Sequence, residues 1–205
     1  MAPAYLIGIN PPASLASELK ALKRMVIEKC GLLPEVGSEP HITLNLNKFP
    51  NLELVDKELS KICSTFPPIQ IVIDGLSTFP NIGSTTVVFA YVKPNPALQT
   101  LQELISTALA PLRDGEHLRE YLKKHQFTDE QVRASERYGY PYIGKGWQPH
   151  MTIAFFDEKQ FADFGQSLLN KPLKHKFVVT ELTLFSWNSS KNNWQPYKIY
   201  PLKTK

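Results

Sequence analysis

Pro40-His41-Ile42-Thr43-Leu44 and Pro149-His150-Met151-Thr152-Ile153 are two copies of one short pattern in a chain of 205 residues. Each copy opens an apolar stretch, HITLNL and HMTIAF, that predicts a β-strand. Successive side chains of a strand point to opposite faces, so His41 shares a face with Thr43, and His150 with Thr152. Each copy therefore presents an imidazole and a hydroxyl side by side on a rigid element.

The repetition matters more than either copy. A lone His-x-Thr is weak, because a half-buried histidine and a threonine present for its strand propensity give the same pattern. Two of the five histidines share all five positions, and chance produces this with a probability on the order of one in a hundred thousand. Two facing copies would place two proton carriers and two hydrogen-bond donors around one cavity. Acid–base cleavage of a phosphodiester needs those groups.

The paired motifs resemble the 2H phosphoesterase superfamily, and within it the LigT-like group of 2′-5′ RNA ligases and 2′,3′-cyclic nucleotide phosphodiesterases. The resemblance covers most of the chain. Gly75–Pro80 and the following Thr86–Val92 resemble the middle section of that group. Leu182–Ser186 and Tyr197–Leu202 resemble its closing hairpin.

The resemblance implies a bilobal α+β fold. It has two pseudo-symmetric lobes, each an antiparallel-rich sheet with helices on its outer face, and each lobe contributes one motif. We expect one catalytic domain over residues 1–205. Residues 111–146 look longer and more polar than the compact members carry there, so we expect a helical and loop insertion at that point.

The resemblance also implies the chemistry. His41, Thr43, His150 and Thr152 are the expected catalytic residues of a metal-independent phosphodiesterase. Its substrate would be a ribose 2′,3′-cyclic phosphate or a 2′-5′ phosphodiester of a nucleotide or RNA end. Two alternatives stay open. One is an enzyme of the same fold that acts on another cyclic phosphate, such as an ADP-ribose derivative. The other is a non-catalytic RNA- or nucleotide-binding module, which the two intact motifs disfavour.

A second candidate region precedes the second motif. Residues 137–147 interleave aromatic side chains with cations and glycines. Aromatic faces can stack on bases, and cations can hold phosphate. The candidate substrate-binding residues are Arg137, Tyr140, Tyr142, Lys145 and Trp147. The alternative is that these aromatics pack the segment onto the body of the protein.

The composition fits a globular domain, with 42% hydrophobic and 20% charged residues. A net charge of +4 suits an anionic ligand but is weaker than a typical nucleic-acid footprint. Cys30 and Cys63 have no metal-ligand spacing and are expected to be small buried hydrophobes in a reducing compartment. We expect no metal or other cofactor, no membrane span, a monomer and a cytoplasmic location.

The apolar periodicity predicts alternating strands and helices. The expected strands are Tyr5–Ile9, 41–46, Ile69–Ile73, Thr86–Val92, 150–156, and a closing hairpin of Phe177–Trp187 and Trp194–Leu202. The expected helices are Ser14–Cys30, Leu52–Ser64, Pro96–Leu112 and Glu158–Leu169. Ser14 is the expected cap of the first helix. His117, Tyr121 and His125 are expected on the solvated face of a further helix.

Overall fold

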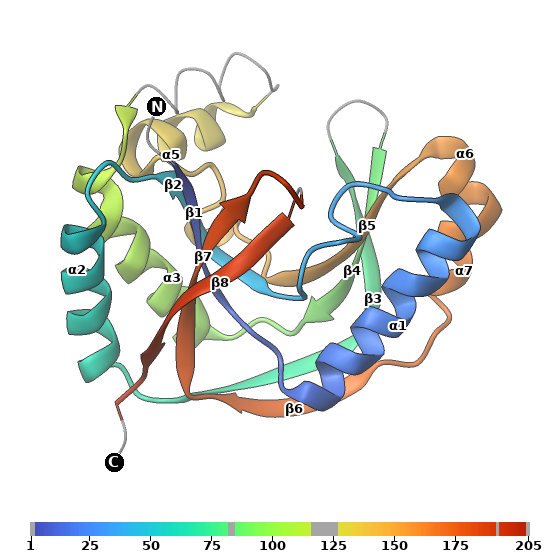
Figure 1. The fold of residues 1–205 in the computed structure, drawn as a ribbon, viewed down its shortest axis with the longest axis horizontal. Coiled ribbons are helices and arrows are strands. Elements are labelled where there is room, and N and C mark those ends of the chain that lie inside the picture. The colour runs from blue at the N-terminus through green and yellow to red at the C-terminus, as the bar shows by residue number, and fades with distance from the viewer. Residues whose placement is uncertain (1–2, 82–84, 116–126, 192, 204–205) are drawn as a thin grey trace.

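Two four-stranded antiparallel sheets organise the molecule, and each draws its strands from distant parts of the chain (Figure 1). The first has the order β2-β1-β7-β8, and the second the order β5-β4-β3-β6. The first sheet consists of β1 (Ala4–Ile9), β2 (Ile42–Lys48), β7 (Glu181–Asn188) and β8 (Asn193–Pro201). The second consists of β3 (Ile69–Asn81), β4 (Thr85–Val92), β5 (His150–Asp157) and β6 (Lys174–Val179).

This computed structural model describes residues 3–81, 85–115, 127–191 and 193–203. The side chains of Pro80, Asn81 and Lys145 also lie outside the described part. His117, Tyr121 and His125, with their expected helix, fall within the residues that are not described.

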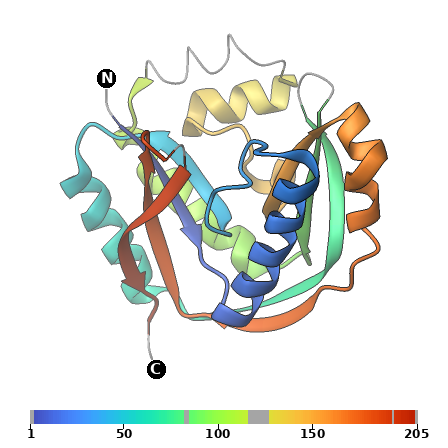
Figure 2. The same cartoon turned by 45° about the vertical axis from the view of Figure 1, so that its right-hand side comes forward.

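Each sheet has its own helices (Figures 1 and 2). In the first lobe, α2 (Leu52–Thr65) packs against β8 and α3 (Pro96–Leu109) packs against β2. In the second lobe, α1 (Ala13–Cys30) packs against β5. Beside α1 lie α6 (Glu158–Gln160), the π-helical turn η3 (Phe161–Gly165) and α7 (Gln166–Leu168). Between α3 and β5 the chain forms η1 (Ala110–Leu112), α5 (Asp129–Tyr138) and η2 (Gly144–Gly146).

Local sequence sets where several helices begin and end. The side chains of Asn51 and Asn95 accept hydrogen bonds from the first free N–H groups of α2 and α3. Thr128 and Gln131 form a capping box at the start of α5, and Gly139 ends that helix with φ 71°. These capping residues set where α2, α3 and α5 begin and where α5 ends.

One continuous apolar core joins the two lobes. It contains Ile7 and Ile42 from the first sheet, Ile71 and Val88 from the second, and Leu19 of α1. Among the described residues, no helix is both long enough and apolar enough to cross a membrane. Cys30 and Cys63 are both free thiols; Cys63 is buried as expected, whereas Cys30 is only half-buried.

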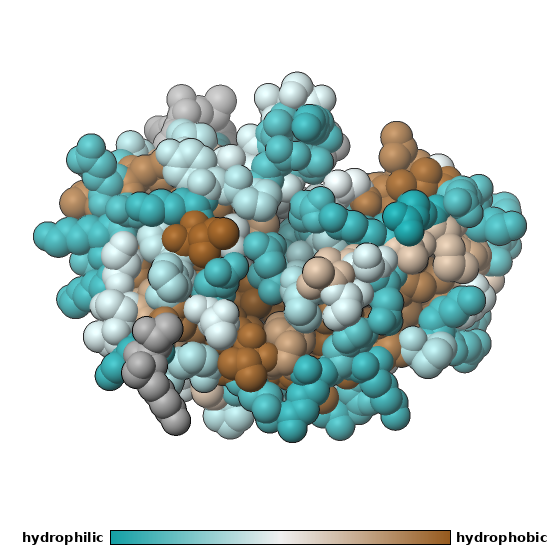
Figure 3. All heavy atoms as spheres, turned by 60° about the horizontal axis from the view of Figure 1, so that its bottom comes forward, coloured by the Kyte–Doolittle hydropathy of each residue, from teal (hydrophilic) through white to brown (hydrophobic). Residues whose placement is uncertain are grey.

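The surface in Figure 3 is largely polar, with apolar areas between the polar side chains. Exposed large apolar residues include Val178 on the edge strand β6, and Tyr197 and Ile199 on the edge strand β8. Scattered apolar residues of this kind are ordinary on protein surfaces and define no site.

The structure confirms the expected α+β fold with two antiparallel sheets, and it corrects details. The first helix begins at Ala13, with Pro12 at the cap position and no side-chain cap, so the predicted role of Ser14 is wrong. Pro12 has φ −62° and ψ 157°, the extended conformation that is usual for an N-cap residue. The predicted helix Glu158–Leu169 contains the π-helical turn η3. A Cβ at Gly165 would lie 2.7 Å from the Phe161 ring, so this turn packs closely.

Two strand predictions have the wrong limits. β3 continues to Asn81 rather than ending at Ile73, because Gly75, at φ 90°, absorbs a register shift and the pairing with β4 then resumes. The predicted strand Phe177–Trp187 is two strands, β6 and β7, which belong to different sheets. Both halves are apolar, so periodicity could not reveal the crossing between lobes at Thr180. The expected helix Pro96–Leu112 ends as α3 at Leu109 and finishes in η1.

Candidate active site

The two motifs stand at the starts of two edge strands that approach each other: β5 begins at His150, whereas β2 begins at Ile42, one residue later than predicted, so His41 lies directly before it. β2 is the outer strand of the first sheet and β5 the outer strand of the second. These two strands are in contact. Segments that lie far apart in the sequence are thereby brought together, one from each lobe.

Both motif strands carry a β-bulge at the same place. Along β2 the pairing with β1 shifts so that Leu44 is the extra residue, and along β5 the pairing with β4 shifts so that Ile153 is. Each extra residue directly follows the motif threonine. A bulge reverses the alternation of faces, so the strand can present its histidine and threonine on one side and still bury apolar residues beyond. The shared bulge is direct evidence of pseudo-symmetry between the lobes.

Each histidine is oriented by the main chain two residues before it. The Nδ1 atom of His41 lies 2.7 Å from the carbonyl oxygen of Glu39, and the Nδ1 atom of His150 lies 2.7 Å from that of Gln148. A carbonyl can only accept, so Nδ1 carries the proton in both rings. When the ring is neutral, its other nitrogen, Nε2, therefore keeps a free lone pair. A proline stands between carbonyl and histidine in both motifs and restricts the residue before it to an extended conformation.

Aromatic side chains pack beside both imidazoles. The His41 ring lies 5.3 Å from the Phe185 ring, and the His150 ring lies 5.0 Å from Phe79 and 5.1 Å from Phe89. Phe89 pairs across the ladder with Thr152, and Gly8 takes the matching position opposite Thr43. A Cβ at Gly8 would lie 2.6 Å from the Ile42 carbonyl oxygen, so the first lobe has no room for a side chain there.

Burial lowers the pKa of both histidines from the ordinary value of 6.5. The hydrogen bonds to Glu39 and Gln148 oppose this effect in part. The negative charge of Glu35 raises the pKa of His41, and the smaller effect of Lys23 lowers it; the charge of His41 lowers the pKa of His150. Both imidazoles are therefore poised to be neutral near pH 7 and to gain a proton when an anion binds beside them.

Thr43 and Thr152 are half-buried, and neither hydroxyl bonds to another group within the described part of the chain. Each hydroxyl thus remains able to donate to a ligand. The main-chain oxygen of Thr43 is occupied, because the indole Nε1 of Trp147 donates to it at 3.1 Å.

Gln102, on α3, joins the first motif strand to the aromatic segment. Its Nε2 donates to the carbonyl oxygens of Leu44 and Tyr142, at 3.1 Å and 3.0 Å, and its Oε1 accepts from the N–H of Gly144 at 3.5 Å. Because Leu44 is a bulge residue on an edge strand, its carbonyl oxygen is available to accept this hydrogen bond. Sequence reasoning missed Gln102, because a glutamine inside a helix carries no motif.

The structure places the five aromatic-segment candidates differently. Trp147 is buried, with 9% of its surface exposed, and the half-buried Tyr142 packs against the core. Tyr140 is half-buried, with its ring 5.6 Å from the Tyr142 ring. Arg137 lies over the Tyr138 ring, at 5.0 Å. The side chain of Lys145 lies outside the described part.

Arg137 lines a hollow of about 430 Å³ with Arg133 and Tyr138, and no motif residue contributes to it. Trp147 lines a different hollow, of about 380 Å³, that reaches Pro149 of the second motif. The segment therefore contacts the motifs mainly through Trp147. Another aromatic pair, Trp187 and Trp194, has ring centroids 5.1 Å apart, and Trp194 clusters with Phe185, the neighbour of His41. Sequence reasoning missed this pair because it had no motif of its own.

Among the described residues, no group of three or more histidine, cysteine, aspartate or glutamate side chains could hold a metal ion. The candidate groups that the two contacting strands carry are imidazoles and hydroxyls. This set can move protons and donate hydrogen bonds to anionic oxygen.

The chain matches the family described as the 2'-5' RNA ligase superfamily over residues 11–191. Similar solved structures include TT0787 of Thermus thermophilus, at 16% identity and a TM-score of 0.64, covering 98% of this chain and 99% of that one. E. coli LigT complexed with 3'-AMP has 15% identity and a TM-score of 0.59, with 100% of both chains covered. At these identities the likeness shows the fold alone. No curated protein sequence matches this chain.

The family match contains both motifs and most of both lobes. Together with the two antiparallel sheets, it confirms the resemblance seen in the sequence. The chain therefore belongs to the 2'-5' RNA ligase superfamily, whose members are 2H phosphoesterases.

Proposed function

We propose that this protein is a metal-independent phosphodiesterase that acts on a ribose 2′,3′-cyclic phosphate or a 2′-5′ phosphodiester of a nucleotide or RNA end. Membership of the superfamily suggests activity on RNA or nucleotide phosphates. The observation that carries the finer proposal is the matched pair of histidines. Both keep Nδ1 on a main-chain carbonyl and so leave Nε2 for proton transfer.

The reaction needs one histidine in each protonation state. For a cyclic phosphate, the neutral histidine takes a proton from water as the water oxygen bonds to phosphorus. The bond from phosphorus to one ribose oxygen breaks, and the protonated histidine gives its proton to that oxygen. The product is a phosphate monoester, and the two histidines have exchanged protonation states. Imidazole suits both roles because its pKa lies close to the working pH.

The threonines supply the remaining stabilisation. Negative charge grows on the non-bridging oxygens in the phosphorane-like transition state. Thr43 and Thr152 each follow their histidine by two residues, and in this proposal their hydroxyls donate hydrogen bonds to those oxygens. Protons and hydrogen bonds carry this reaction, so it needs no metal ion.

A nucleotide is the class of ligand that the proposal favours. The related structures of E. coli LigT, obtained with 3'-AMP and with ATP, support this choice. Tyr140 is the strongest remaining candidate to stack on a base. The buried Trp147 and the largely packed Tyr142 fit the alternative role of holding the segment in place.

A panel of substrates tests the proposal. Purified protein in EDTA is given a 2′,3′-cyclic nucleotide, a 2′-5′ dinucleotide, the 3′-5′ dinucleotide as control, and an ADP-ribose cyclic phosphate. We expect turnover of one of the first two and none of the 3′-5′ control. Turnover of only the ADP-ribose compound would select the alternative substrate class. Binding of nucleotides without turnover of any substrate would indicate a binding module.

A further inference from the structure

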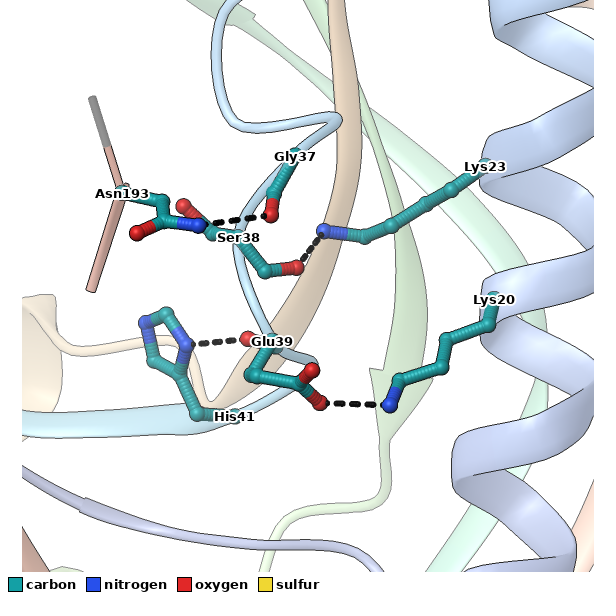
Figure 4. Close-up of polar contacts among 7 residues, drawn as sticks. All are labelled: Lys20, Lys23, Gly37, Ser38, Glu39, His41 and Asn193. Atoms are coloured by element: carbon teal, nitrogen blue, oxygen red, sulfur yellow. Dashed lines mark hydrogen bonds and ion pairs between the residues drawn. The ribbon is translucent and has the colours of Figure 1, made fainter. Parts of the chain in front are cut away.

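Lys23 is a buried cation whose bonds all go to the main chain. It lies on α1 with only 4% of its surface exposed. Its Nζ donates to the carbonyl oxygen of Glu35 at 2.7 Å and to that of Ser38 at 2.8 Å. Figure 4 shows the side chain reaching from α1 to the segment that leads into His41. Burying an ammonium group is costly unless it is well bonded, so this arrangement calls for an explanation beyond packing.

The segment that Lys23 binds has an unfavourable local conformation. Glu35 has φ 65°, in the left-handed region that a residue with a side chain rarely adopts. Its main-chain oxygen also accepts from the N–H of Ser38 at 3.1 Å. The ammonium of Lys23 thus joins the two ends of a tight turn. Without it, two carbonyl oxygens would be left in a largely buried place without their charged partner.

This turn continues directly into the group that orients His41. Ser38 is followed by Glu39, and the carbonyl oxygen of Glu39 is the partner of His41 Nδ1. The position of that oxygen therefore depends on where the turn is held. His150 has no lysine in the same role within the described part of the chain, since its partner Gln148 follows η2 and Trp147.

We propose that Lys23 is a positioning residue for His41: it fixes the turn at residues 35–38 so that the Glu39 carbonyl holds the imidazole with Nε2 facing the site. The importance of this role for turnover rests on the proposed function, but the geometry does not. Lys23 acts through the main chain and does not touch substrate.

The charges around Lys23 agree with this role. Burial lowers its pKa to about 8, while Glu35 and Glu39 raise the pKa and Lys20 lowers it. Lys20 also reaches this turn, but it pairs with the Glu39 carboxylate at 2.8 Å, and both side chains are 45% exposed. An exposed pair of this kind contributes little to stability. Lys20 is therefore a matched control: the same residue type, one turn away on the same helix, bound to the same loop.

The experiment compares Lys23→Met with Lys20→Met by nitrogen-15 NMR of the imidazole rings and by kinetics. In wild type and Lys20→Met we expect neutral His41 to carry its proton on Nδ1. In Lys23→Met we expect a mixture of the two tautomers at His41, with His150 unchanged. With a 2′,3′-cyclic nucleotide, Lys23→Met should lower kcat about ten-fold or more with little change in KM, because one of the two proton-transfer groups is misplaced. Lys23→Arg should recover part of this loss.

Lys23→Gln is a second variant for the case in which Lys23→Met does not fold. Its shorter, uncharged amide cannot hold the carbonyl oxygens of Glu35 and Ser38 as the ammonium does, so we expect mixed tautomers at His41 and an unchanged His150. An unchanged His41 tautomer in whichever of these two variants folds would overturn the proposal. A changed tautomer in a protein without phosphodiesterase activity would keep this role for Lys23 and reject the proposed function.

Discussion

His41 and His150 stand at the starts of two contacting strands from opposite lobes, and a positive charge on His41 lowers the pKa of His150. Each ring is already held with Nδ1 on a carbonyl oxygen. The first proton to bind therefore makes the second harder to bind, and the singly protonated pair is favoured over a range of pH. That state is the one that acid–base catalysis requires.

The first prediction concerns pH. Burial lowers the pKa of both histidines, so the free protein is singly protonated at a pH below 6.5. The profile of kcat/KM should be bell-shaped with its maximum below pH 6.5. A bound anionic phosphate raises both pKa values, so the kcat profile should be displaced to higher pH. Initial rates from about pH 4.5 to 9 check both statements. A maximum of kcat/KM at or above pH 6.5 would contradict the expected shift.

The second prediction concerns the hydroxyls. Thr43→Val and Thr152→Val keep the branched shape of the side chain but remove the donor. Each should lower kcat by about ten- to a thousand-fold, the range for loss of one transition-state donor. Thermal unfolding should change little, since neither hydroxyl bonds within the described part of the chain. A rise in KM alone, with kcat intact, would show that the hydroxyls bind substrate and transition state equally.

The third prediction concerns the link between the aromatic segment and the first motif. Trp147→Phe keeps an aromatic ring but removes the N–H that donates to the Thr43 carbonyl. Leaving that oxygen without its partner should destabilise the fold by about 1–3 kcal/mol. Urea unfolding measures the loss. Trp187→Phe is the control, because the Trp187 side chain is 39% exposed, and it should change stability much less.

The fourth prediction concerns base recognition. If Tyr140 stacks on a base, Tyr140→Ala should weaken nucleotide binding by about 1–3 kcal/mol. Binding of a ribose cyclic phosphate without a base should weaken less, since it offers no stacking partner. Calorimetry with the two ligands separates these cases. Equal losses for both ligands would assign Tyr140 to packing rather than to base recognition.

Much of the fold could be predicted because strands and helices here follow simple periodicity. HITLNL and HMTIAF fall within or beside β2 and β5, and the apolar spacing of α2 predicts its limits to within a residue. The crossing of the chain at Thr180 could not be predicted. Residues on both sides of it are strand-forming, and only the tertiary structure decides that β6 joins one sheet and β7 the other.

The repeated motif predicts which side chains are candidates for the site but not how they are held. The carbonyls of Glu39 and Gln148 carry no sequence signal, because any residue has a carbonyl. The bulges at Leu44 and Ile153 have no sequence signal either, since both residues are ordinary apolar strand residues. In the sequence, Lys23 resembles any surface lysine of an amphipathic helix. Its burial depends on the turn at residues 35–38, which no pattern in the sequence predicts.

The most direct measurement is turnover of a 2′,3′-cyclic nucleotide in EDTA by wild type, His41→Ala, His150→Ala and the double variant. Each single change removes one proton-transfer partner and should lower kcat by about a hundred-fold or more. The double variant should lose little beyond either single one, because both groups act in one transition state. His175→Ala removes a histidine that pairs with Glu18 instead, and it should keep wild-type turnover. Near-wild-type turnover in either His41→Ala or His150→Ala would contradict the two-histidine account.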